Sequence, residues 1–362
     1  MSVTLDKIKT YEGGKSNIPG KKNIIKLSSN ESPFGPSRKV LKAIKQASGK
    51  TNRYPNADSL ELKKNICKRY KVPTKNIFVG NGSDEILGLL CQLFLSKNDE
   101  VIIPKHSFLM YEIYASINNA KIKYSNVNDY SFIVDDIIKK VTNKTKIIFI
   151  AQPNNPTGIY LDKKNLSKLL KKIPKRLMVV IDAAYSEFIN NSDYTDGLNL
   201  VMKNRNIIVT HTFSKIYGLA SLRLGWCAAP ERIINLLDRI RGPFNVNQIA
   251  QVAGSAALSD TNYEKKVIRH NTIWLKKFKS ELAKFPLKVY DSQANFIFIK
   301  VMNATKLNKY LLSNGIIVRT LDNYEIFDCL RISIGTTLEN TKFLNLIKNF
   351  FKNEKKQKKL TI

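Results

Sequence analysis

Cysteine is scarce in this sequence of 362 residues, and its four copies lie far apart, with no Cys-x-x-Cys pair. They stand at Cys67, Cys91, Cys227 and Cys329. Structural zinc sites and redox motifs need closely spaced cysteines, so the spacing favours reduced thiols, no metal and a cytoplasmic location. Disulfide bonds are the less favoured alternative.

Long apolar runs are also missing. A membrane-spanning helix needs about 18 or more consecutive apolar residues, whereas a run such as residues 177–181 ends within a few positions. Residues 1–15 hold no apolar stretch of the length that a signal peptide needs. We therefore expect no membrane partner.

Acidic residues are few, because 29 Asp and Glu stand against 60 Lys and Arg, which gives a net charge of +31. A basic protein that binds nucleic acid is the non-enzymatic interpretation of this charge. Only 12 of the 60 are arginine, the side chain preferred for base and bidentate phosphate contacts, and the lysines are spread along the chain. We therefore expect solvated helix surfaces, no nucleic-acid partner, and a field that attracts small anions.

Histidine occurs three times, at His106, His211 and His270. No two of them have the spacing of a metal-ligand pair. The sequence therefore predicts structural or solvated histidines and no metal site.

Short apolar, β-branched runs alternate with helix-like segments through the first two thirds of the chain. Such runs do not alternate with polar residues, which is typical of strands covered on both faces by helices. The pattern predicts an α/β fold with a large domain of three layers, αβα, around a mostly parallel sheet. The expected strands are residues 76–79, 100–103, 121–124, 146–151, 178–181 and 207–210.

The pattern changes near residue 245, where one long helical stretch is expected up to residue 282. Short strands and a last helix follow, which predicts a smaller α+β domain. Residues 352–359 are rich in lysine and are expected to form a frayed, solvated tail. The expected organisation is an N-terminal arm (1–29), a large cofactor-binding domain (30–244) and a small C-terminal domain (245–362). The strands expected in the small domain are residues 296–300, 316–319 and 330–334, and the last helix is 340–352.

The segment from Thr210 to Gly225 surrounds one lysine, Lys215, with hydroxyl groups and small residues. Desolvation there would lower the pKa of the amine and free it to form a Schiff base. Thr212, Ser214 and Arg223 are suitable phosphate donors. Pyridoxal 5′-phosphate requires such an amine beside a group of hydrogen-bond donors that bind its phosphate. In a chain with 48 lysines, an ordinary surface lysine is the alternative.

Two further segments place polar residues after expected strands. Asp182 ends one strand, at the edge where α/β sheets bind ligands, and its carboxylate can pair with a protonated pyridine nitrogen. Tyr185 and Asn155 can both hydrogen-bond the oxygen of such a ring. A helix cap at Asp182 and an ordinary turn at Asn155 are the alternatives.

The residues Gly80-Asn81-Gly82-Ser83-Asp84 lead from a strand into a helix. Free N–H groups and the dipole at a helix N-terminus favour a bound phosphate. A simple capped strand–helix connection is the alternative.

Together these motifs resemble those of the fold-type I pyridoxal-phosphate aminotransferases, in the branch that contains the histidinol-phosphate aminotransferases. The resemblance covers residues 27–335. The matching motifs are NESPFGPS (30–37), RYP (53–55), GNGSDE, QPNNPTG, DAAYSEF, TFSKIYGLASLRLG, ANFIF (294–298), GIIVR and LRISIGT.

The resemblance implies pyridoxal 5′-phosphate as cofactor and a role for each matching residue. Lys215 would bind the cofactor covalently and later move the α-proton, Asp182 would pair with the ring nitrogen, and Asn155 and Tyr185 would hold the ring oxygen. Phe108 would stack on the ring. The phosphate would be held by backbone groups of Ser83 and Asp84 and by Thr212, Ser214 and Arg223.

The resemblance also implies how substrates and subunits bind. Arg331 and Arg319 would hold the anionic ends of substrates, and Asn30 and Glu31 would lie near the substrate's far end. Tyr54 would reach the cofactor phosphate of a neighbouring subunit, which implies a homodimer with shared active sites.

The implied reaction is a ping-pong transamination between L-histidinol phosphate and 2-oxoglutarate in histidine biosynthesis. An aminotransferase for aromatic or other amino acids, or a pyridoxal-phosphate-dependent O-phospho-amino-acid decarboxylase, is the alternative. Two positions depart from the family pattern: Ser221 stands where a glycine is usual, and Asn56-Ala57 replaces the usual Asp-Gly. Neither position carries a predicted catalytic group.

Overall fold

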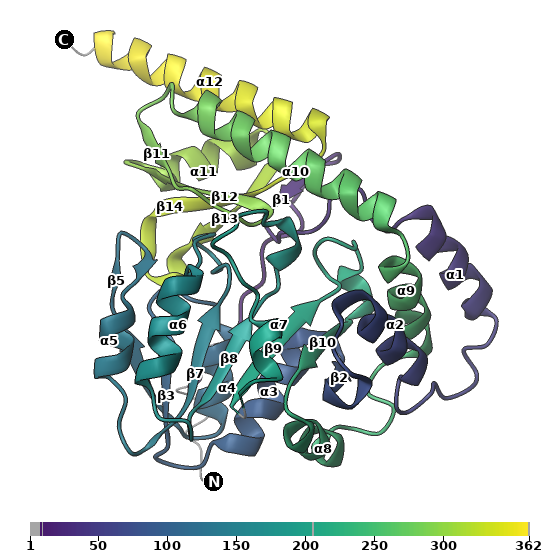
Figure 1. Cartoon of the computed structure of the whole chain (residues 1–362). Helices are drawn as coiled ribbons and strands as arrows, with labels where there is room; N and C mark the ends of the chain where they lie inside the picture. Colours follow the sequence, from purple (N-terminus) through teal and green to yellow (C-terminus); the bar gives the residue numbers. More distant parts are fainter. Residues whose placement is uncertain (1–7, 9, 205, 361–362) are drawn as a thin grey trace.

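The computed structural model describes residues 8, 10–204 and 206–360, which form a larger and a smaller sheet surrounded by helices (Figure 1). The larger sheet has the strand order β2-β10-β9-β8-β7-β3-β4. All its strands are parallel except β10, which runs antiparallel to both its neighbours. The strands are β2 (Ile77–Gly80), β3 (Glu100–Pro104), β4 (Lys121–Ser125), β7 (Thr145–Ala151), β8 (Met178–Asp182), β9 (Ile207–Thr212) and β10 (Gly225–Ala228).

Helices cover both faces of this sheet, and alternate strand residues point into two separate cores. In β7, Ile147 and Phe149 join one core, and Ile148 and Ile150 join the other. This explains the unbroken apolar runs, and it confirms the predicted three-layer αβα architecture. One face carries α3 (Gly82–Phe94), α4 (Met110–Ile117) and α8 (Glu231–Ile240). Six further helices contribute residues that belong to or pack against the other core: α1 (Arg38–Ser48), α2 (Leu60–Tyr70), α5 (Val134–Lys139), α6 (Lys163–Lys172), α7 (Leu198–Val201) and α9 (Gln248–Leu258).

The long helix expected up to residue 282 is wrong in one respect, because the structure contains two helices there. After α9, the chain turns at Ser259 and restarts as α10 (Thr261–Leu282). Asp260 caps the new helix by accepting a hydrogen bond from the backbone N–H of Tyr263 at 3.1 Å. Such a cap satisfies an N–H that the helix itself cannot pair.

The smaller sheet has the strand order β1-β13-β14-β12-β11 and lies above the larger one in Figure 1. Helices α10, α11 (Ala304–Ser313) and α12 (Thr337–Leu360) contribute the rest of its core. The strands are β1 (Ile25–Leu27), β11 (Leu287–Val289), β12 (Phe296–Val301), β13 (Ile316–Leu321) and β14 (Ile326–Ser333), and a separate hairpin is formed by β5 (Val127–Asn128) and β6 (Ser131–Phe132).

Two elements do not follow the expected domain boundaries. Strand β1, from the expected N-terminal arm, pairs with β13 of the smaller sheet, while residues 1–7 and 9 of that arm lie outside the described residues. Helix α10 places Val267 in the core of the larger sheet and Phe278 in that of the smaller one. The boundaries at residues 29 and 244 therefore stay a prediction.

The expected fraying of the tail is wrong, because α12 continues to Leu360, whereas Lys352, Asn353 and Lys355 are exposed to solvent as predicted. Phe350 and Phe351 are buried and fix the helix to the smaller core, and Glu354 forms an ion pair with Lys306 of α11. Beyond them the chain consists mainly of Lys, Glu and Gln, which propagate a helix well once it has begun.

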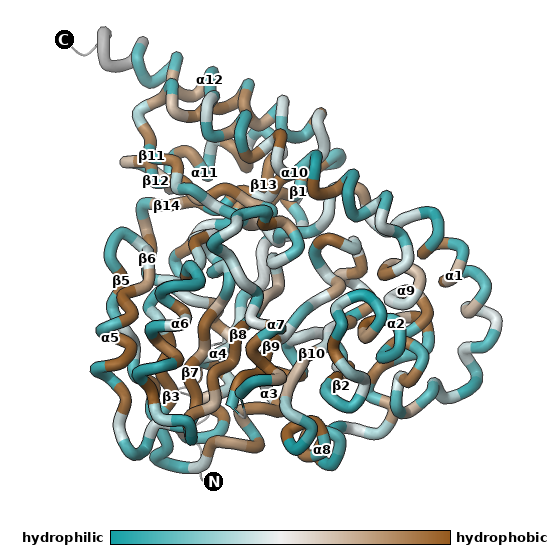
Figure 2. The backbone as a smooth tube through the Cα atoms, viewed as in Figure 1, coloured by the Kyte–Doolittle hydropathy of each residue, from teal (hydrophilic) through white to brown (hydrophobic). Residues whose placement is uncertain are grey.

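Hydrophilic residues dominate the outer helix surfaces and hydrophobic residues the strands, as Figure 2 shows. Among the described residues, no helix is long and apolar enough to cross a membrane, and no three His, Cys, Asp or Glu side chains gather in a way that would hold a metal ion. The four cysteines are free thiols. The cytoplasmic location stays a prediction.

Candidate active site

A pocket of about 390 Å³ lies where the carboxyl ends of the parallel strands meet the smaller sheet. Ligands of α/β sheets bind at this edge. Every predicted site residue lines the pocket except Tyr54: Asn30, Glu31, Ser83, Asp84, Phe108, Asn155, Asp182, Tyr185, Thr212, Ser214, Lys215, Arg223, Arg319 and Arg331.

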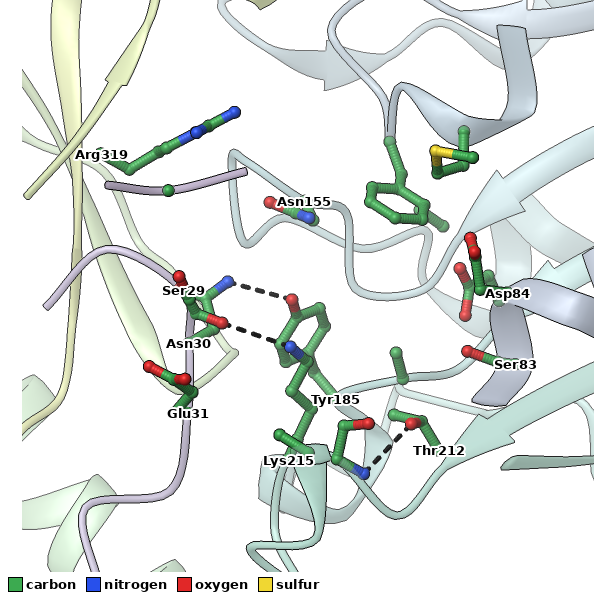
Figure 3. Close-up of a pocket in the computed structure, with 18 of the residues that line it drawn as sticks. Ser29, Asn30, Glu31, Ser83, Asp84, Asn155, Tyr185, Thr212, Lys215 and Arg319 are labelled. Atoms are coloured by element: carbon green, nitrogen blue, oxygen red, sulfur yellow. Dashed lines mark hydrogen bonds between the residues drawn. The ribbon is translucent and has the colours of Figure 1, made fainter. Parts of the chain in front are cut away.

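Lys215 follows β9 and extends its amine into the middle of this pocket (Figure 3). Its Nζ atom lies 3.4 Å from the carbonyl oxygen of Ser29 and 5.6 Å from the ring centroid of Tyr185. Burial and, next, the positive charge of Arg331 lower the pKa of Lys215 to about 8. Roughly a tenth of this amine is therefore unprotonated, and hence nucleophilic, at pH 7, far more than for a lysine with the ordinary pKa of about 10.4.

Asp182 is the last residue of β8 and is buried behind the pocket. Its Oδ2 atom accepts a hydrogen bond from the hydroxyl of Tyr111 at 2.7 Å, and its Oδ1 atom accepts one from Thr210 at 3.1 Å. Burial raises the pKa of Asp182, and these hydrogen bonds oppose that rise. The arrangement suits a carboxylate that receives a cationic partner from the pocket.

Tyr185 lies next to Lys215, and its hydroxyl accepts a hydrogen bond from Nδ2 of Asn30 at 3.0 Å (Figure 3). Burial raises the pKa of Tyr185, so the phenol stays protonated and can donate a hydrogen bond toward the pocket. The neighbouring Asn155 turns its amide oxygen to Arg331. Together these groups offer donors for an oxygen atom near the amine.

Ser83 and Asp84, at the N-terminus of α3, lie across the pocket from Asn30 and Ser29 (Figure 3). Together with Arg223 they form a second polar wall. Nη1 of Arg223 lies 3.5 Å from the hydroxyl of Ser214. Gly82 has a φ of +83°, and a Cβ atom there would lie only 2.6 Å from Nη2 of Arg223, so glycine lets the guanidinium approach the helix end. Free backbone N–H groups, hydroxyls and a guanidinium form an anion site.

Arg319 of β13 and Arg331 of β14 stand directly opposite each other on adjacent strands, and both are buried. Nη2 of Arg331 donates to the carbonyl of Ser28 at 2.6 Å, and Nη2 of Arg319 to that of Glu12 at 2.7 Å. Within the described part of the chain, Nε of Arg331 is buried without a partner. Two buried like charges in register repel each other, so the pair is suited to an anionic ligand.

Tyr54 does not join its own pocket. Its side chain is 82% exposed, and its ring stacks on Phe244 with centroids 4.5 Å apart. This is the one predicted site residue that the folded chain places away from the others.

The sequence reasoning missed three aromatic residues that line the pocket: Tyr11, Tyr111 and Tyr324. The position of Tyr111 could have been predicted, because it stands three residues after Phe108 and thus on the same side of a helical turn. Tyr11 contacts the edge of the Phe108 ring, with centroids 6.4 Å apart. No periodic pattern surrounds Tyr11 or Tyr324, so nothing in the sequence indicated their position.

Comparisons with known proteins agree with this architecture. The family model described as aminotransferase class I and II matches residues 22–347. The histidinol-phosphate aminotransferase of Pelagibacter ubique is 44% identical over 350 residues, which is 95% of this chain and 97% of that protein. That of Paramagnetospirillum magneticum is 41% identical over 348 residues, with 95% and 96% covered.

The fold also matches a solved structure. The crystal structure of histidinol-phosphate aminotransferase from Sinorhizobium meliloti in complex with pyridoxal-5′-phosphate superposes with a TM-score of 0.84. The match is 24% identical and covers 91% of this chain and 92% of that one. At this identity the likeness concerns the fold.

Proposed function

The chain belongs to the class I and II aminotransferase family, and we propose that it transfers the amino group between L-histidinol phosphate and 2-oxoglutarate. The observation that carries this assignment is the 44% identity over 350 residues to a histidinol-phosphate aminotransferase. The site geometry supports the same chemistry, since it joins a nucleophilic amine with two binding places for anions. It is a pyridoxal-phosphate-dependent transaminase.

The pocket fits pyridoxal 5′-phosphate, because it offers an amine, a buried carboxylate and an anion site. Lys215 would hold the aldehyde carbon, Asp182 the ring nitrogen, and the α3 N-terminus with Thr212, Ser214 and Arg223 the phosphate. Gly82 has no side chain that would keep the guanidinium of Arg223 from the free N–H groups of α3, so this wall offers donors to a phosphate. When bound, the cofactor supplies a carbonyl that captures amines and a ring that accepts electrons from Cα.

The chain's own residues supply proton transfer and positioning. Lys215 has a pKa of about 8, so its Nζ atom can take a proton from the substrate's Cα and return it near neutral pH. Tyr185 would donate a hydrogen bond to the cofactor's ring oxygen, and Asn155 would bind the same oxygen. Phe108 lines the same pocket and would cover the ring face.

Arg319 and Arg331 would bind the anionic ends of both substrates. A guanidinium group pairs with carboxylate and phosphate in the same bidentate geometry, so one pair of arginines serves histidinol phosphate and 2-oxoglutarate in turn. Asn30 and Glu31 line the pocket on the side of the smaller sheet and would lie near the far end of the substrate.

A donor–acceptor assay tests this function. Histidinol phosphate with 2-oxoglutarate should give glutamate, and borohydride reduction followed by peptide mapping should label Lys215. Lys215→Ala should lose the absorption band of the bound cofactor and at least a hundredfold in kcat, as expected for a group that forms the covalent link and transfers the proton. Release of carbon dioxide without glutamate, or activity only with another amino donor, would contradict the assignment.

We further propose that the protein works as a homodimer in which Tyr54 completes the partner's phosphate site. Tyr54 and Phe244 form an exposed aromatic pair, and neither lines the chain's own pocket. Aromatic residues exposed to this degree are typical of protein interfaces.

Mixed dimers test the shared site. Tyr54→Ala and Lys215→Ala are each expected to be nearly inactive. After mixing under exchange conditions, activity should return to about a quarter of the wild-type value, because half of the dimers contain one intact site. Sedimentation gives the mass, and a lack of recovery in a mixture shown to contain hybrid dimers would exclude sharing.

A further inference from the structure

His211 is a buried histidine that the mechanism above does not use. It lies on β9 between Thr210 and Thr212, so its side chain points to the opposite face of the sheet from theirs. The side chain is 1% exposed. Its ring stacks on Trp226 of the adjacent strand β10, with centroids 4.6 Å apart and planes inclined by 8°.

Each ring nitrogen of His211 faces a carboxylate. Nδ1 lies 3.3 Å from Oε1 of Glu187, in the short 3-10 helix that follows Tyr185. Nε2 lies 4.0 Å from Oδ2 of Asp196, too far for a hydrogen bond, and has no hydrogen-bond partner among the described residues. Nδ1 is also 3.4 Å from the hydroxyl of Ser186. A neutral imidazole carries one N–H and one lone pair, so in either tautomer a lone pair would face a carboxylate. Two protons on the ring remove this repulsion.

The groups around Glu187 leave His211 as its cationic partner. The hydroxyl of Tyr70 donates to Oε1 of Glu187 at 3.1 Å and lies 3.1 Å from the hydroxyl of Tyr217. Arg69 is paired with Glu264 instead, at 2.5 Å. Burial raises the pKa of Tyr70 further than its neighbours do, so this hydroxyl stays neutral and adds no charge.

A charge on His211 would act electrostatically on Asp182, which lies on the catalytic side of the sheet. Thr210, the preceding residue, pairs in register with Asp182 and donates to its carboxylate at 3.1 Å. Burial raises the pKa of Asp182, while the hydrogen bonds from Tyr111 and Thr210 and then the charge of His211 lower it. A positive charge behind the strand therefore favours the ionised form of a carboxylate that has no arginine or lysine bound to it among the described residues.

We propose that His211 is a positioning residue whose two ring nitrogens both carry a proton, that Glu187 and Asp196 hold this cation, and that its charge keeps Asp182 ionised for the cofactor's ring nitrogen. The proposal rests on the proposed function, because that function assigns Asp182 to this nitrogen. It extends the active site to the far face of the sheet, beyond the groups that touch the ligand.

Nitrogen NMR on the holoenzyme tests the protonation state. The chain has three histidines, so ¹⁵N-histidine labelling gives few signals, and loss of one set in His211→Gln assigns that residue. At pH 7.5 the wild-type signals of His211 should show two protonated nitrogens, and in Glu187→Gln they should show one. A singly protonated ring in the wild type would overturn the proposal.

Ring-labelled [¹⁵N]pyridoxal 5′-phosphate tests the consequence for Asp182. We expect the cofactor nitrogen to be protonated in the wild type and less so in both His211→Gln and Glu187→Gln, with kcat about tenfold lower and KM nearly unchanged, for a loss of about one pKa unit of support. Tyr70→Phe is the matched control, since it removes a hydrogen bond to Glu187 and leaves every charge.

The outcomes separate the two proposals. If the wild type binds no cofactor, the proposed function fails. If the wild type binds it with a protonated ring nitrogen, and both charge-removing variants leave that nitrogen and kcat unchanged or alter them only as much as Tyr70→Phe does, the role of His211 alone is excluded. Should His211→Gln not fold, Glu187→Gln decides the question.

Discussion

At the scale of single residues, the site depends on charged groups that the fold holds in unusual surroundings. Lys215, Asp182 and Arg331 all occupy the same pocket and are shielded from water to different degrees. The positions of Lys215 and Asp182 at the ends of strands were predictable from the sequence, whereas Arg331 lies within β14 and was predicted only through the family resemblance. Tyr111, which donates to Asp182, was not predicted, although its spacing of three residues from Phe108 could have indicated it.

The lowered pKa of Lys215 predicts a distinct reactivity. In protein freed of cofactor, Lys215 should be half-reactive toward a limiting amine reagent near pH 8, and its labelling should rise with pH as the ammonium loses its proton. Exposed lysines should reach this point near pH 10.4 and serve as internal controls. Peptide mass spectrometry across a pH series measures both, and a midpoint near 10 for Lys215 would contradict the pocket's electrostatics.

At the scale of elements, the close approach of β10 to the N-terminus of α3 shapes the anion site. The sequence did not predict β10, because the strand is only four residues long, begins with glycine and runs against its neighbours. The parallel strands were predictable, since burial on both faces leaves them uniformly apolar. The break between α9 and α10 was missed because the helical pattern is continuous on both sides and only Ser259 and Asp260 separate the two helices.

Gly225 of β10 tests this approach. A Cβ atom at this position would lie 2.2 Å from the backbone nitrogen of Ser83, so Gly225→Ala should push α3 away and weaken the phosphate site. We expect a loss of about 1–3 kcal/mol in unfolding free energy and weaker cofactor binding, measured by denaturant unfolding and by titration. Gly242→Ala is the control, because no atom lies within 4 Å of its added Cβ. Equal behaviour of the two variants would show that the contact is unimportant.

At the scale of the whole molecule, the excess of positive charge has a kinetic meaning. A net charge of +31 on a chain whose substrates are anions creates an attractive field around the protein. The sequence predicted this attraction, and it predicted the two-sheet architecture. It could not predict which face of the folded chain carries the exposed Tyr54 and Phe244 pair, because that depends on how distant segments pack.

Salt should therefore weaken substrate capture. Raising sodium chloride from 50 to 500 mM is expected to increase KM for histidinol phosphate by about threefold with kcat nearly constant, because the screening length falls well below 10 Å. Steady-state kinetics measures this, with an uncharged amino donor as control. A KM independent of salt would show that the surface lysines do not guide the substrate.

The pairing of β1 with β13 also determines when the two parts of the pocket can come together during synthesis. Ser28, just after β1, accepts a hydrogen bond from Arg331, 303 positions later. At a synthesis rate of about 5–20 residues per second, Ser28 is made roughly 15–60 s before Arg331. Within that interval the residues assigned to the cofactor, up to Arg223, are all made before the substrate-binding Arg331, so the substrate side of the pocket is completed last.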